Sequence, residues 1–256
     1  EVFGVGRIKQ SVCFGAFVSQ TTPEELIKAA AELGFASVEM LPEEYWPAVK
    51  AAGMEVAIVG GHQSLRDGLN KRGNHERIEA ELRESISKAA RHAIPALIVF
   101  SGNREGLDDE AGIEICAEGI KRVISQAEDE GVVLCMELLN SKVNHPDYQC
   151  DSTAWGVKLC QAVGSPNFKL LYDIYHMQIM EGDLIRTIRD NIEYIGHFHT
   201  AGNPDRRDLD DEQEIYYPAV MRAIAESGYA GYVGHEFRPK GDWLQALKET
   251  FVLCDV

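Results

Sequence analysis

The sequence predicts an α/β fold, a (β/α)8 TIM barrel formed as a single domain over residues 1–256. Eight short β-rich runs recur along the chain with helical patterns between them, and strict alternation of this kind implies parallel strands joined by crossover helices. Eight such units in about 250 residues match the size of a TIM barrel. The rival, an open doubly wound sheet, needs a glycine-rich phosphate turn after its first strand, and the sequence has none there.

The elements are expected in strict order, after an N-terminal extension at residues 1–10. The expected strands are SVCFGAF (11–17), SVEML (37–41), EVAIVGG (55–61), ALIVFSG (96–102), VVLCMELLN (132–140), FKLLYD (168–173), YIGHFHT (194–200) and YVGHEF (232–237). The clearest helical patterns cover 22–34, 75–93, 110–131, 153–164 and 217–228. Thr22-Pro23 and Gly34 are typical start and stop signals for the first helix. No linker or shift in composition marks a second domain.

Composition excludes several classes of function. The net charge of -16 argues against a nucleic-acid partner, because phosphate binding needs clustered Lys and Arg. No apolar run approaches the ~20 residues that a membrane helix needs, so we expect a soluble protein with no membrane partner. The six cysteines form no CxxC pair and are expected to be buried free thiols. A cytoplasmic location is the default, with the periplasm as the alternative if an N-terminal leader was removed.

Four consecutive strands end in a side chain that can bind a metal. Glu137, Asp173, His199 and Glu236 close the fifth to eighth strands, and the carboxyl ends of barrel strands carry the active site. Three carboxylates at one rim would raise each other's pKa, and a divalent cation relieves this repulsion. Three carboxylates and one imidazole suit Mn²⁺, Mg²⁺ or Co²⁺, while Zn²⁺ is not excluded. Because side chains alternate along a strand, His197 shares the face of His199 and is expected to be a buried supporting histidine.

The motifs that contain these residues resemble the hydroxypyruvate isomerase family, within the xylose-isomerase-like TIM barrels. The resemblance covers nearly the whole chain and is strongest over 132–238. Its motifs are MELLN (136–140), YDIYHMQIMEGD (172–183), GHFHTAGNPDR (196–206), DEQEIYYPAV (211–220) and GYAGYVGHEFRP (228–239).

The resemblance implies an isomerase that binds its metal through the four strand-end residues. It implies that Glu137 and Glu236 also act as catalytic acid and base, and that His176 and Arg206 hold substrate oxygens. Aldose–ketose isomerisation passes through an enediolate, and the reaction implied is hydroxypyruvate to tartronate semialdehyde or a related small hydroxy-carbonyl conversion. We expect a small sugar or hydroxy-keto acid as substrate, and a homo-oligomer is possible.

Further rim residues are candidates for the substrate pocket. His62 follows the third strand, Asn103 the fourth, and Lys142 the fifth. Glu39 and Glu43 follow the second strand. For His62, Asn103, Glu39 and Glu43, an ordinary loop role is at least as plausible. The acidic run at 208–214 is expected to be a solvated loop, although it could cover the site or form an interface.

Two departures from the resemblance keep other activities open. Many hydroxypyruvate isomerases carry Gln where this chain has His199, and Asn-Thr-Arg where it has Asn140-Ser141-Lys142, whereas ketose epimerases carry His at the former position. The alternatives are therefore a ketose 3-epimerase or a keto-polyol dehydratase on the same metal site. A non-catalytic sugar-binding barrel is less favoured. A DNA-repair endonuclease of the superfamily would need a histidine-rich multi-metal cluster and a basic face, and neither is present in full.

Overall fold

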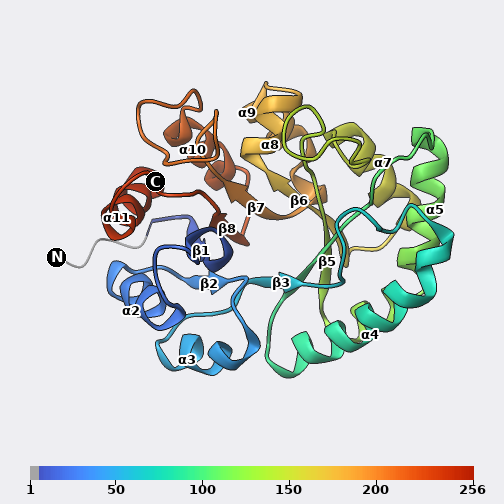
Figure 1. The fold of residues 1–256 in the computed structure, drawn as a ribbon, viewed down its shortest axis with the longest axis horizontal. Helices are drawn as coiled ribbons and strands as arrows, with labels where there is room; N and C mark the ends of the chain where they lie inside the picture. Colours follow the sequence, from blue (N-terminus) through green and yellow to red (C-terminus); the bar gives the residue numbers. More distant parts are fainter. Residues whose placement is uncertain (1–5) are drawn as a thin grey trace. The chain divides into compact units, whose positions relative to one another are not determined.

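Eight parallel strands alternate with helices over residues 6–256, the part of the chain that the computed structural model describes (Figure 1). The strands are β1 (Lys9–Cys13), β2 (Ser37–Glu39), β3 (Ile58–Gly60), β4 (Ala96–Val99), β5 (Val133–Glu137), β6 (Phe168–Asp173), β7 (Ile195–Thr200) and β8 (Tyr232–His235). The α-helices are α1 (Phe14–Phe17), α2 (Pro23–Leu33), α3 (Trp46–Ala51), α4 (His75–Arg91), α5 (Asp109–Lys121), α6 (Ile124–Glu130), α7 (Thr153–Val163), α8 (Ile174–Met180), α9 (Leu184–Asn191), α10 (Tyr217–Glu226) and α11 (Trp243–Cys254). Three 3₁₀ helices complete the list: η1 (Glu43–Tyr45), η2 (Arg72–Asn74) and η3 (Ile192–Tyr194).

The chain divides into two compact units, which are described separately. The first unit holds residues 6–57, 183–192 and 197–256, and its strands follow the order β2-β1-β8-β7. The second unit holds residues 58–182 and 193–196, and its strands β3 to β6 pair in sequence order. Every one of these pairs is parallel, as the alternation of strands and helices predicts.

Most observed strands are shorter than the predicted runs, and the larger differences lie at the first strand and at the helical pattern over 110–131. The run predicted as one strand over 11–17 is β1 followed by the short helix α1, and β1 begins at Lys9, inside the expected N-terminal extension. The rest of that extension includes residues 1–5, which lie outside the described residues. The pattern over 110–131 forms two helices, because the amides of Arg122 and Val123 bond to carbonyls only three residues back and end α5 there.

Local start and stop signals explain where several helices begin and end. The Thr22 hydroxyl accepts from the amide of Glu25, whose carboxylate accepts from the amide of Thr22, so α2 opens with a complete capping box. Gly34 ends the same helix at φ 95°, a left-handed conformation that favours glycine. These caps confirm the predicted limits of the first long helix.

The cysteines and the helices of the described residues bear on two points raised by composition. All six cysteines are buried and free, as predicted. Within residues 6–256, none of the helices combines the length and the apolar character required to cross a bilayer.

Candidate active site

His199 and Glu236 lie side by side at the carboxyl ends of β7 and β8 in the first unit. The two strands are parallel neighbours, with His199 opposite Gly234 in the register. Alternation therefore places Glu236, two residues after Gly234, just beyond His199 on the same side. The Nδ1 atom of His199 lies 3.1 Å from Oε2 of Glu236, and His199 is only 1% exposed. The structure thus brings together two of the four residues predicted to bind metal.

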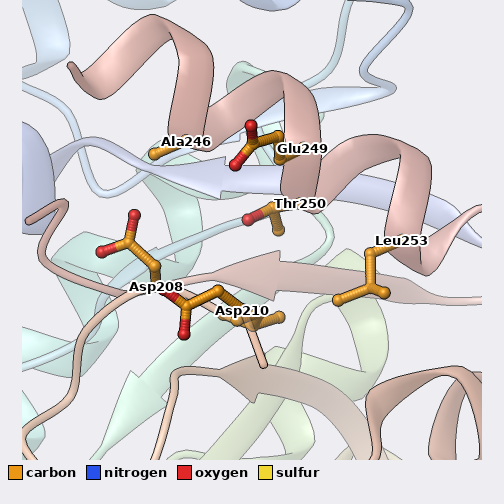
Figure 2. Close-up of a pocket in the computed structure, with 7 residues that line it drawn as sticks. Asp208, Asp210, Ala246, Glu249, Thr250 and Leu253 are labelled. Carbon is orange, nitrogen blue, oxygen red and sulfur yellow. The ribbon is translucent and has the colours of Figure 1, made fainter. Parts of the chain in front are cut away.

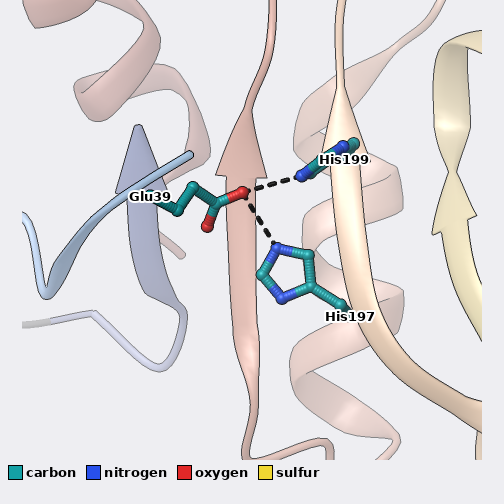
Figure 3. Close-up of side chains that lie close together, drawn as sticks. All are labelled: Glu39, His197 and His199. Carbon is teal, nitrogen blue, oxygen red and sulfur yellow. Dashed lines mark hydrogen bonds and ion pairs between the residues drawn. The ribbon is translucent and has the colours of Figure 1, made fainter. Parts of the chain in front are cut away.

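A third residue, Glu39 at the end of β2, holds both histidines of β7 (Figure 3). Oε1 of Glu39 lies 2.7 Å from Nε2 of His199 and 3.1 Å from Nε2 of His197, and all three side chains are buried. Burial alone would raise the pKa of Glu39, but the electrostatic attraction and hydrogen bonds of the two imidazoles outweigh it and hold that pKa well below its ordinary value. An ionised carboxylate only accepts hydrogen bonds, so both Nε2 atoms donate.

The contacts of Glu39 are ones that the sequence does not reveal, since from the sequence a loop role is at least as plausible for this residue. The available signal was a glutamate inside the apolar run SVEML, because a buried carboxylate requires partners. His197 is buried on the same face as His199, as alternation predicted.

Gly234 makes the contact between Glu39 and the histidines possible. A Cβ at this position would lie 2.4 Å from Oε1 of Glu39 and 2.9 Å from Cδ2 of His199, closer than real Cβ atoms come. Because β8 lies between β1 and β7, any larger residue here would block the path of the Glu39 side chain.

Arg206 reaches Glu236 from the loop that follows β7. Its Nη2 atom lies 2.5 Å from Oε2 of Glu236, and its carbonyl accepts from the amide of Arg238. Asp205 and Arg206 have φ values of 76° and 58°, so two successive left-handed residues turn the chain at this point. Arg206 therefore contacts a predicted catalytic carboxylate.

In the second unit, Glu137 and Asp173 end the neighbouring strands β5 and β6. Glu137 is opposite Leu171 in the register, so alternation turns Asp173, two residues further along, to the same side. Both carboxylates are buried, with Asp173 only 1% exposed. Oδ1 of Asp173 also accepts from the amide of His176 and caps α8.

His176, in the first turn of α8, is fully buried and has a defined tautomer. Its Nδ1 atom accepts from the backbone amide of Asn140 at 3.2 Å and lies 2.6 Å from the Asn140 side-chain nitrogen. Since Nδ1 is the acceptor, Nε2 carries the proton in the neutral ring. Nε2 lies 3.8 Å from Oδ2 of Asp173. The predicted substrate contact of His176 would therefore be made as a donor.

The three weaker candidates for substrate binding are engaged with the protein backbone. The ammonium group of Lys142 donates to the carbonyls of Ile179 and Met180, at 3.1 Å each, and so caps the end of α8. The backbone amide of Asn103 donates to the carbonyl of Arg66, and the carbonyl of Asn103 accepts from the side-chain amide of Asn70. Their roles toward substrate stay predictions.

His62 bridges two backbone groups in the neutral form. Its Nε2 atom accepts from the amide of Phe100 at 3.0 Å, and its Nδ1 atom lies 2.9 Å from the carbonyl of Gln63. Burial lowers the pKa of His62 below its ordinary value of 6.5. Protonation would also remove the acceptor that Phe100 uses.

We expect His62 to make the protein less stable in acid. Below about pH 6.5 the unfolded chain binds a proton here that the folded chain does not, so the free energy of unfolding falls as pH falls. The free energy of unfolding would be measured with urea at about pH 7.5 and at about pH 5.5. The decrease between these two pH values should be larger in the wild type than in His62→Gln by roughly 1 kcal/mol. Equal losses in the two proteins would contradict this role.

The acidic run after Arg206 is held by Lys240 rather than left fully solvated. The Lys240 ammonium group lies 2.7 Å from Asp210 and 2.6 Å from Glu212, and its amide donates to Asp208. These hydrogen bonds raise the pKa of Lys240 above its ordinary value. A small pocket between this run and α11 is lined by Asp208, Asp210, Glu249 and Thr250 (Figure 2). It contains none of the predicted site residues.

Comparison with known proteins identifies what the chain is similar to. The family model described as xylose isomerase-like TIM barrel matches residues 27–252, which confirms the predicted fold class. A putative hydroxypyruvate isomerase of Mus musculus is 28% identical over 91% of this chain and 92% of its own length. A 2-oxo-tetronate isomerase of Pectobacterium atrosepticum is 30% identical over 84% of this chain and 86% of its own length.

Solved structures agree on the fold. A structure titled AP endonuclease, family 2, from Brucella melitensis has a TM-score of 0.84 and 26% identity, and the match covers 94% of this chain and 97% of that one. D-Psicose 3-epimerase from Clostridium cellulolyticum H10 has a TM-score of 0.79 and covers 97% of this chain and 100% of that one. At 20% identity, the latter shows the fold alone.

Proposed function

Because the chain belongs to the xylose isomerase-like TIM barrel family and is an isomerase, we propose that it interconverts a small hydroxy-carbonyl compound with the help of a divalent metal ion. The substrate class proposed is hydroxypyruvate or a related sugar or keto acid. The observation that carries the proposal is the grouping at Glu236. One oxygen of this carboxylate lies within hydrogen-bonding distance of both an imidazole nitrogen and a guanidinium nitrogen.

The residues at the strand ends fit a divalent ion. We propose that it is held by Glu137, Asp173, His199 and Glu236, whose donor set of three carboxylates and one imidazole suits Mn²⁺, Mg²⁺ or Co²⁺. Support comes from burial, because ionised carboxylates that leave water need a compensating positive charge. The chemistry that such an ion supplies when bound is Lewis-acid polarisation of the substrate carbonyl.

The protein's own groups would then move the proton. Glu236 is proposed as the general base that removes a proton from the carbon beside the carbonyl, and Glu137 as the group that serves the opposite face of the substrate. General acid–base catalysis of this kind is typically worth ~10²–10⁴-fold. Arg206, which touches Glu236, would orient the substrate end remote from the reacting carbon.

Product analysis tests the proposal directly. Purified protein loaded with Mn²⁺ would be incubated in heavy water with hydroxypyruvate, with 2-oxo-tetronate and with a panel of four- to six-carbon ketoses. We expect an isomer of unchanged composition, with deuterium at the carbon that receives the proton. A product that has lost water would identify a dehydratase instead. No conversion of any compound by the metal-loaded protein would contradict the proposal.

A ketose 3-epimerase is the second candidate. It is favoured by His199, which stands where many hydroxypyruvate isomerases carry glutamine and where ketose epimerases carry histidine. In the same experiment an epimerase would return the proton to the carbon that lost it, with inversion. The position of the deuterium therefore separates the two activities.

We expect both Arg206→Lys and Arg206→Ala to lower kcat/KM, the alanine variant by roughly 10- to 100-fold, as for loss of a charge-assisted hydrogen bond. Lysine keeps the charge but loses the planar fork that grips two oxygens together. Because a small substrate needs orientation against both glutamates, kcat should fall as well as KM rise. Steady-state kinetics on the best substrate decides this. Wild-type values in both variants would remove Arg206 from the site.

A further inference from the structure

We propose that Glu39 is a positioning residue that fixes the tautomer and orientation of His199, so that the Nδ1 atom of this imidazole is presented for metal binding. The inference rests on the proposed function, in which His199 is a metal ligand. Glu39 itself would not bind the metal or the substrate. Its effect would pass entirely through the ring of His199.

The hydrogen bond between Glu39 and His199 leaves one arrangement of the imidazole proton. Oε1 of Glu39 lies 2.7 Å from Nε2 of His199, a short distance typical of charge-assisted hydrogen bonds. The carboxylate accepts, so Nε2 carries the proton and Nδ1 keeps its lone pair in the neutral ring. Nδ1 is also the atom that faces Glu236, at 3.1 Å. The donor atom therefore points to the neighbouring proposed ligand.

His197 explains how an ionised carboxylate is tolerated at this depth. Glu39 is completely buried, and its second oxygen, Oε2, has no hydrogen-bond partner among residues 6–256. Both imidazoles instead converge on Oε1. His197 thus supplies the second donor, without which the carboxylate would depend on His199 alone. This gives a reason for two histidines one residue apart on β7.

The strands are arranged to let this contact form. Glu39 lies on β2 and the histidines on β7, with β1 and β8 between them in the strand order of the first unit. The side chain crosses β8 at Gly234, where a Cβ would lie 2.4 Å from Oε1. Three features therefore favour this contact: the length of the Glu39 side chain, the absence of a side chain at Gly234, and the two imidazole donors on β7.

A separate metal centre formed by Glu39, His197 and His199 is the competing explanation for this cluster. Two atoms that bind one ion at ~2.0–2.2 Å in tetrahedral geometry lie more than about 3 Å apart. The separation of 2.7 Å between Oε1 of Glu39 and Nε2 of His199 is shorter than that. It fits a hydrogen bond, and the positioning role is therefore the one we argue.

The test compares Glu39→Gln with Glu44→Gln, an exposed glutamate of η1 that undergoes the same change. The affinity for Mn²⁺ would be measured by calorimetry on the otherwise unchanged protein. We expect Glu39→Gln to weaken binding by about 10- to 100-fold, the usual effect of losing a supporting carboxylate, and Glu44→Gln to leave it unchanged. Equal affinities in the wild type and Glu39→Gln would overturn the proposal, as would two Mn²⁺ ions per chain in the wild type and one in the variant.

A second measurement needs no metal, and its decisive result comes from the wild type alone. Nitrogen-resolved NMR of isotope-labelled histidines in the metal-free wild type should show His199 protonated at Nε2 only. In Glu39→Gln the other tautomer should appear in measurable amount. Protonation of His199 at Nδ1 in the wild type would overturn the proposal even if the variant failed to fold. If the tautomer is as expected but no Mn²⁺ binds to the wild type, the proposed function fails, and with it the role of Glu39 toward a metal.

Discussion

Glu236→Gln is expected to lower kcat by roughly 100-fold or more while the fold survives. The amide keeps an oxygen that can still contact a metal ion and can still accept from Arg206, so the shape of the site is preserved. What it loses is the ability to take up a proton at neutral pH. The loss should therefore be expressed mainly in kcat, because the step that fails is proton removal from the bound substrate.

Two measurements make this result specific. Metal content must be equal in the variant and the wild type, so that a fall in kcat is not a fall in loading. Glu226→Gln is the matched control, since Glu226 is an exposed glutamate at the end of α10 that pairs with Arg189. It should behave as wild type. An unchanged kcat in fully loaded Glu236→Gln would show that the base lies elsewhere.

Asp173→Asn is expected to weaken metal binding by about 100-fold or more, with little loss of stability. A 100-fold weaker affinity corresponds to roughly 2.7 kcal/mol of lost attraction between the carboxylate and the metal ion. Asp173 caps a helix in the structure and is also proposed to bind the metal ion. One oxygen caps α8 by accepting from the amide of His176. Asparagine is an equally good helix cap, so this contact survives the change. Only the negative charge disappears, and with it the proposed attraction for a divalent ion.

Asp242→Asn provides the control for the cap. Asp242 caps α11 in the same way, accepting from the amide of Gln245 at 2.8 Å, but it is exposed and has no proposed metal role. Mn²⁺ titrations and thermal unfolding of the metal-free proteins should show both variants close to wild type in stability and only Asp173→Asn impaired in binding. Wild-type Mn²⁺ affinity in Asp173→Asn would remove this residue from the ligand set.

The sequence by itself determined the succession of strands and helices. Alternation of β-rich runs with helical patterns requires parallel strands, and this is a local property that each segment carries on its own. The caps at Thr22 and Gly34 are equally local. The clearest helical patterns do not cover α1, α3, α8, α9 and α11. These segments are short or lie beside motif residues, and their apolar spacing alone gives too weak a pattern.

The sequence also determined which residues stand at the strand ends, because Glu137, Asp173, His199 and Glu236 each follow a recognisable apolar run. Only the tertiary structure showed what surrounds them. Glu39 reaches histidines 158 and 160 residues away, and Arg206 pairs with Glu236, 30 residues further along the chain. No local pattern specifies such contacts, since they depend on strand order and on the space left by Gly234. The physical reason is that a buried charge is tolerated only where the whole fold brings donors to it.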